Sequence, residues 1–188
     1  MRTFIAFKIK PQEKLVQLIN FFQGSLRGEA IKWVDINNLH LTLKFTGDTS
    51  ESQIASISNI LEEIAARYPV VNLKFRGVGY FKNNSQPSVL FLKIDENNVL
   101  INLVRDINTE LEKIGFEGES GRYKPHLTLA RIKYLNDKST FFNLTNRFKD
   151  DIIQTEEIGH IIFYQSILKP AGADYRELTR KKLNYSGK

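Results

Sequence analysis

The chain has 188 residues, a formal net charge of +6 and a pI of about 9.4. It contains no cysteine, which excludes disulfides, thiolate nucleophiles and cysteine-type zinc sites, and its basic charge suits either a polyanionic partner or a solvated lysine-rich surface. A run of about 18 apolar residues and a signal-peptide pattern are both missing, so we expect a soluble, unprocessed, cytoplasmic protein that is monomeric and has no membrane partner.

Hydrophobic spacing predicts strands and helices that alternate along the first half of the chain. Apolar residues at every second position indicate strands, and apolar residues three to four positions apart indicate helices. We expect strand 2–9, helix 11–25, strands 30–36 and 40–46, helix 50–67 and strand 70–81. The turn-forming cluster at residues 83–87 then interrupts the pattern. We place a lobe boundary there, which divides one domain, residues 1–188, into approximate halves 1–86 and 87–188.

The second half repeats this order in register with the first. We expect strand 88–95, helix 97–114, strand 126–132, helix 138–149, strand 156–168 and a last strand 174–182. His126 follows His40 by 86 positions, and the same offset carries the first strand onto residues 89–95. This predicts a duplicated unit whose halves face each other across a pseudo-two-fold axis, with repeated functional residues at the cleft between them.

The tetrapeptide His-Leu-Thr-Leu begins at His40 and again at His126. Because side chains alternate along a strand, His40 and Thr42 point to one face while the leucines between them point to the core, and His126 and Thr128 repeat this arrangement. A single histidine is more often a structural residue that satisfies a backbone group. Two of them at equivalent positions of a repeat favour a shared functional role.

Two histidines and two threonines suit phosphoryl chemistry without a metal. One imidazole can activate water on one side of a phosphorus atom while the other protonates the leaving oxygen, and threonine hydroxyls can donate to the phosphate oxygens. A metal site is the alternative, but two histidines without a carboxylate or thiolate at ligand spacing supply too few ligands. We therefore expect no metal.

The segments at residues 38–45 and 123–131 resemble the two motifs of the two-histidine phosphoesterase superfamily, in particular the RNA 2′,3′-cyclic phosphodiesterases, also called 2′-5′ RNA ligases. The resemblance extends over nearly the whole chain. It implies a bilobal α+β fold in which two antiparallel sheets line a central cleft with the helices outside. It also implies cofactor-free hydrolysis of a 2′,3′-cyclic phosphate at an RNA end to a 2′-phosphate, with the reverse 2′-5′ ligation as a further capacity.

The resemblance also implies roles for individual residues. His126 is the base that activates water, His40 is the acid, and Thr42 and Thr128 bind the phosphate. Arg131 is a phosphate contact if the strand bulges, since in a regular strand its side chain lies on the face opposite Thr128; a surface salt bridge is the alternative.

Two other functions remain open at this point. One is a noncatalytic RNA- or nucleotide-binding module on the same fold, and the other is an enzyme that acts on small cyclic nucleotides. Aromatic side chains could stack on the terminal base of an RNA. The candidates are Trp33, Tyr80, Phe81 and Tyr123, and the alternative is that these residues belong to the hydrophobic core.

Overall fold

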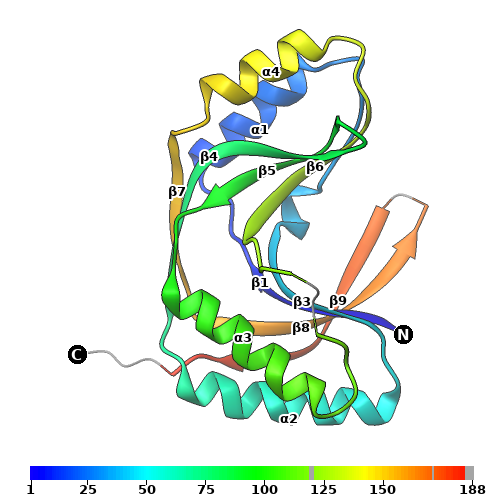
Figure 1. Ribbon diagram of the computed structural model, residues 1–188, viewed down its shortest axis with the longest axis vertical. Coiled ribbons are helices and arrows are strands. Elements are labelled where there is room, and N and C mark those ends of the chain that lie inside the picture. The colour runs from blue at the N-terminus through cyan, green and yellow to red at the C-terminus, as the bar shows by residue number, and fades with distance from the viewer. Residues whose placement is uncertain (119–120, 171, 185–188) are drawn as a thin grey trace.

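The computed structural model describes residues 1–118, 121–170 and 172–184 (Figure 1). Its strands are β1 (Arg2–Lys8), β2 (Ala30–Trp33), β3 (His40–Asp48), β4 (Val71–Asn83), β5 (Gln86–Ile94), β6 (His126–Tyr134), β7 (Ile152–Ile158), β8 (His160–Lys169) and β9 (Gly172–Lys182). Its helices are α1 (Glu13–Ser25), α2 (Glu51–Arg67), α3 (Asn98–Glu112) and α4 (Lys138–Arg147), and a short 3₁₀ turn, η1 (Ile36–Asn38), precedes β3. The predicted order of strands and helices is confirmed, except that the single strand expected at residues 156–168 is two strands.

The strands form two antiparallel sheets, as the expected α+β class requires. The four-stranded sheet has the order β3-β1-β8-β9, and the five-stranded sheet has the order β2-β6-β5-β4-β7. Helices α2 and α3 cover the outer face of the four-stranded sheet, and α1 and α4 cover the outer face of the five-stranded sheet (Figure 1). The buried apolar residues of both layers form one continuous cluster, so the two sheets share a core.

The pseudo-two-fold relation appears directly in the sheet order. The 86-residue offset carries β3 onto β6, and it matches β1 with β5 and β4 with β8. The three strands β3-β1-β8 therefore correspond, in the same order, to β6-β5-β4. The repeated His-Leu-Thr-Leu segments lie at equivalent places, at the start of β3 in one sheet and of β6 in the other.

The predicted lobe boundary at residues 83–87 is wrong. Residues 83–86 form the tight turn of the β4–β5 hairpin inside one sheet, with Asn84 and Ser85 both at positive φ, as a two-residue hairpin turn of this kind requires. The two halves instead exchange elements. Strand β4 from the first half joins the sheet of β5 and β6, while β8 from the second half joins the sheet of β1 and β3.

The predicted strand 156–168 is also corrected. It is two strands, β7 and β8, which separate at Gly159 and belong to different sheets. Residues 161–164 of β8 form a continuous apolar run that is buried on both faces of its sheet, and such a run does not mark where the chain changes sheet.

Candidate active site

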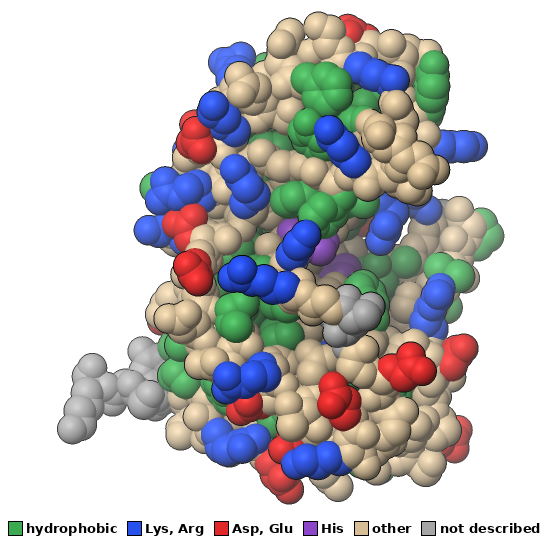
Figure 2. All heavy atoms as spheres, in the orientation of Figure 1, with side chains coloured by type: hydrophobic (Ala, Val, Ile, Leu, Met, Phe, Trp, Pro, Cys, Tyr) green, Lys and Arg blue, Asp and Glu red, His purple; other side chains and the backbone are tan. Residues whose placement is uncertain are grey.

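His40 and His126 are held in the same way. The Nδ1 atom of His40 lies 2.7 Å from the carbonyl oxygen of Asn38, and Nδ1 of His126 lies 2.8 Å from the carbonyl oxygen of Lys124. Since a carbonyl oxygen only accepts, Nδ1 must carry the proton in both rings. This leaves Nε2 of each imidazole as the nitrogen available to a ligand. In the space-filling view, histidine side chains lie set back between the upper and lower parts of the molecule, with Lys and Arg side chains around them (Figure 2).

The local backbone explains why both rings reach back to a carbonyl two residues earlier. His40 follows Leu39, whose φ is −61° at the end of η1. His126 follows Pro125, whose ring imposes a φ of about −65°. The same backbone direction is thus produced once by a turn of 3₁₀ helix and once by proline.

Each histidine packs against two aromatic rings. The ring of His40 lies 5.0 Å from that of Phe4 and 5.1 Å from that of Tyr175. His126 lies 4.9 Å from Phe81 and 5.4 Å from Phe91. These contacts fix the imidazole planes and keep part of each ring out of water.

The electrostatic environment of His40 favours its neutral form. Burial lowers the pKa of His40 below the ordinary value of 6.5, the hydrogen bond to Asn38 opposes this, and the positive charges of His126 and Arg131 lower the pKa further. The last two contributions show that His126 and Arg131, both on the five-stranded sheet, lie within electrostatic reach of His40 on the other sheet. In the absence of a ligand, His40 is therefore neutral at pH 7.

We expect a bound phosphate to reverse this shift. An anion between the histidines favours the imidazolium form, so inorganic phosphate should raise the pKa of His40, which in the free protein should titrate below 6.5. NMR titration of the imidazole Cε1 protons measures both values. His160 is the control, because burial and the charges of Arg180 and Lys182 also lower its pKa. A His40 midpoint above 6.5 in the free protein, or one that phosphate moves no more than that of His160, would contradict this expectation.

The sign of this shift also sets how stability depends on pH. Below about pH 6.5 the unfolded chain binds a proton at His40 that the folded protein resists, so the free energy of unfolding falls as the pH decreases toward the folded-state pKa.

Thr42 and Thr128 lie on the same strand faces as the histidines. Both are half-buried, whereas the leucines between them are fully buried. Neither hydroxyl has a hydrogen-bond partner among the described residues. Two donors are therefore free for a ligand beside the two Nε2 atoms.

A β-bulge decides the direction of Arg131. Thr128 pairs with Phe91 of β5, but the next β5 residue, Leu90, pairs with Ala130, so Leu129 is the extra residue. Leu129 and Ala130 are both buried, and alternation resumes one residue later. The strand therefore bulges as the sequence prediction required, and Arg131 lies on the same face as Thr128. Its positive charge acts on the pKa values of His40 and Tyr175.

The same bulge occurs in β3. Thr42 pairs with Ala6 and Lys44 with Ile5, which makes Leu43 the extra residue. Phe45 therefore occupies the position that corresponds to Arg131, and its side chain is 65% exposed. The two walls of the site thus differ at equivalent positions, with an aromatic ring on one and a guanidinium on the other.

Of the four aromatic residues predicted as stacking candidates, only Phe81 lies against a histidine. Trp33 packs against the core, and Tyr80 packs against Phe141 and Phe142 of α4. The hydroxyl of Tyr123 donates to the carbonyl of Thr42 at 2.8 Å, which ties the segment before β6 to β3.

Three aromatic residues that contact the histidines were not predicted to do so: Phe4, Phe91 and Tyr175. Phe4 and Tyr175 belong, with Ala6, Ile162 and Tyr164, to a small apolar cluster separate from the main core, on the histidine face of the four-stranded sheet. The signal that could have predicted these contacts is the presence of aromatic residues at strand positions whose side chains point away from the main core.

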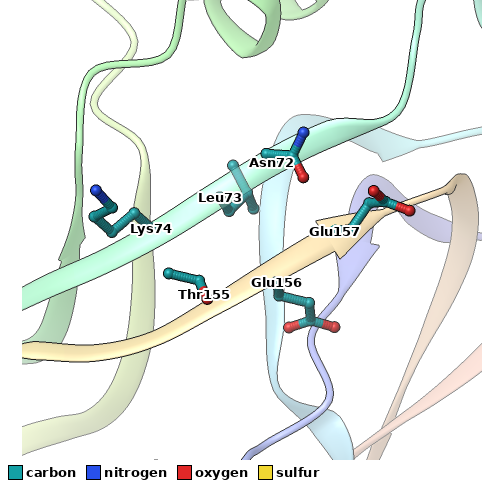
Figure 3. A pocket seen from close by; sticks show the side chains of 6 residues that line it. All are labelled: Asn72, Leu73, Lys74, Thr155, Glu156 and Glu157. Carbon is teal, nitrogen blue, oxygen red and sulfur yellow. The ribbon is translucent and has the colours of Figure 1, made fainter. Parts of the chain in front are cut away.

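A cavity of about 310 Å³ lies between β4 and β7 (Figure 3). Asn72, Leu73, Lys74, Thr155, Glu156 and Glu157 line it, and none of these residues was predicted to belong to the site. Burial raises the pKa of Glu156, whose carboxylate accepts hydrogen bonds from the Lys10 amide and the Gln154 side chain. This cavity contains no imidazole and offers no acid–base pair of the kind formed by the histidines.

The described part of the chain has neither a cluster of metal ligands nor a helix that could cross a membrane. Within residues 1–118, 121–170 and 172–184, histidine, aspartate and glutamate side chains form no group of three or more that could hold a metal ion. Over the same ranges, every helix is too short or too polar to span a bilayer.

The chain is similar in sequence and in fold to known proteins. The family described as LigT like Phosphoesterase matches residues 8–91. The RNA 2′,3′-cyclic phosphodiesterase of Methanocaldococcus jannaschii is 31% identical over 175 residues, which cover 93% of this chain and 96% of that protein. The enzyme of the same name from Thermotoga maritima is 31% identical over 178 residues, 95% of this chain and 93% of that protein. The crystal structure of TT0787 of Thermus thermophilus has a TM-score of 0.81 at 25% identity, with 100% of both chains covered.

Proposed function

The chain belongs to the LigT-like phosphoesterase family and is an enzyme of that family, and we propose that it hydrolyses the 2′,3′-cyclic phosphate at an RNA end to a 2′-phosphate without a metal ion. The observation that carries the proposal is the matched pair of histidines, each with Nδ1 bound to a backbone carbonyl and Nε2 available. The names of the relatives from Methanocaldococcus jannaschii and Thermotoga maritima support the substrate class.

The proposed step is an in-line displacement at phosphorus. Nε2 of His126 takes a proton from water as the water oxygen bonds to phosphorus, the bond from phosphorus to O3′ breaks, and Nε2 of His40 delivers a proton to O3′. The hydroxyls of Thr42 and Thr128 and the guanidinium of Arg131 donate to the non-bridging oxygens, where negative charge accumulates. With the 5′-hydroxyl of a second RNA in place of water, the same step forms a 2′-5′ linkage.

To act as the acid, His40 must be protonated, but its lowered pKa in the free protein disfavours the protonated imidazole. The substrate supplies the missing condition, because its anionic phosphate stabilises an imidazolium beside it. We therefore propose that His40 gains its proton as the substrate binds and then acts as the acid, with His126 as the base.

Product analysis tests the function. We expect nucleoside 2′,3′-cyclic phosphates and oligonucleotides with a 2′,3′-cyclic end, incubated with the protein in EDTA, to yield 2′-phosphates, which ³¹P NMR distinguishes from 3′-phosphates. The reason is that the mechanism uses imidazoles and hydroxyl donors alone. A 3′-phosphate product would show that O2′, and not O3′, is the leaving oxygen. Activity lost in EDTA and restored by one divalent ion would contradict a metal-free step, and turnover confined to mononucleotides would favour the small-nucleotide alternative.

A further inference from the structure

Two positive side chains lie directly opposite each other on the histidine face of the five-stranded sheet. Lys32 of β2 pairs with Arg131 of β6 in the antiparallel ladder, so their side chains share one face. Ile31 and Trp33, the neighbours of Lys32 in the chain, both pack against the core, which directs Lys32 away from it. Both cationic side chains belong to exposed residues.

This pair is unfavourable in the protein alone. Like charges directly opposite in a sheet repel each other. Across the described residues, neither Lys32 nor Arg131 forms an ion pair with a carboxylate that would offset the repulsion. An anionic ligand between the two side chains would remove the repulsion.

The pair also lies next to the proposed catalytic centre. Because Leu129 is the bulged residue, Arg131 is two ladder positions beyond Thr128, a distance of about 7 Å along the strand. The charge of Arg131 is felt at His40 on the opposite sheet. A ligand that fills the site between the histidines therefore has Arg131 beside it, and Lys32 lies one strand further out on the same face.

The opposite wall has no cation at the position that corresponds to Arg131. The position that corresponds to Arg131 on β3 is Phe45, which contacts Phe4 with ring centroids 6.3 Å apart. The opposed pair of Lys32 and Arg131 therefore distinguishes the two walls, and this gives the substrate a direction across a site whose histidines are nearly symmetric.

We propose that Lys32, together with Arg131, forms a second phosphate subsite that binds the 5′-phosphate of the terminal nucleotide. This inference rests on the proposed function, because it places the cyclic phosphate between His40 and His126. The subsite favours RNA ends, in which that 5′-phosphate links to the rest of the chain, over nucleosides that carry only the cyclic phosphate.

The test compares two ligands that represent products and do not react further, adenosine 2′-phosphate and adenosine 2′,5′-bisphosphate. Isothermal titration calorimetry on the full chain gives the ratio of their dissociation constants. In the unsubstituted protein, we expect the added phosphate to tighten binding by about three- to fivefold, the upper part of the range for one exposed ion pair. In Lys32→Gln the ratio should fall to about one- to twofold.

The matched control is Lys138→Gln, which removes the same charge from the exposed start of α4 on the outer face of the same sheet. This variant should keep the ratio of the unsubstituted protein. A ratio near one in the unsubstituted protein, or an equal ratio in Lys32→Gln, would overturn the subsite. Because the assay needs no turnover, its failure is distinguishable from failure of the proposed hydrolysis, which the product analysis in EDTA measures.

Discussion

Replacement of either His40 or His126 by alanine is expected to lower kcat/KM for a 2′,3′-cyclic phosphate by roughly 10²- to 10⁴-fold, the usual contribution of one general acid or base. The double variant should be little slower than the slower single variant. In the proposed mechanism both imidazoles act in one displacement at phosphorus, and loss of one leaves the other without a productive step, so we expect the two effects to be strongly non-additive.

The third histidine of the chain supplies the control. His160 begins β8 and was not predicted to take part in catalysis, so His160→Ala should retain kcat/KM within a few-fold. Thermal unfolding of all four variants separates loss of catalysis from loss of folding. Losses that multiply in the double variant would mean that the two histidines act independently, and the paired mechanism would be wrong.

A substrate with a better leaving group at the 3′ position should show which histidine is the acid and which is the base. If His40 protonates O3′, a substrate whose leaving oxygen needs no proton should restore most of the activity of His40→Ala, a recovery of roughly 10²-fold or more. The same substrate should leave His126→Ala inactive, because water activation is still missing. Single-turnover rates for the two variants on the two substrates measure this directly.

The opposite pattern would exchange the two roles. Rescue of His126→Ala would identify His126 as the acid and His40 as the base, which the lowered pKa of His40 in the free protein would then explain without proton uptake. The rescue experiment and the phosphate-dependent titration of His40 are therefore two independent tests of which histidine is the acid.

The elements of the fold could be predicted from the sequence because their signals are local. Strand and helix periods are visible within ten to twenty residues, and the offset between His40 and His126 places β3 and β6 at equivalent positions. The offset does not indicate which sheet a strand joins. That depends on pairing between distant segments, such as β1 with β8, and the expected lobe boundary was wrong for this reason.

The site could be predicted only where a residue's direction follows from regular alternation. His40, Thr42, His126 and Thr128 stand before the bulges, and their strand faces are as expected. Arg131 stands after a bulge that only the pairing with β5 reveals, so its direction could be stated only as a condition. The aromatic residues around the histidines come from other strands, and no local pattern connects them to the motifs.

The exchange of elements between the two halves has a consequence for how the substrate is received. The chain passes from one sheet layer to the other after β1, β2, α2, β5, α3 and β7, and a single core joins both layers. Hinge closure needs two bodies joined at a few flexible residues, which this connectivity does not provide. The separation of the two imidazoles is thus fixed when the protein folds. Under the proposed mechanism, the entropy of aligning acid and base is therefore lost during folding and not at each turnover.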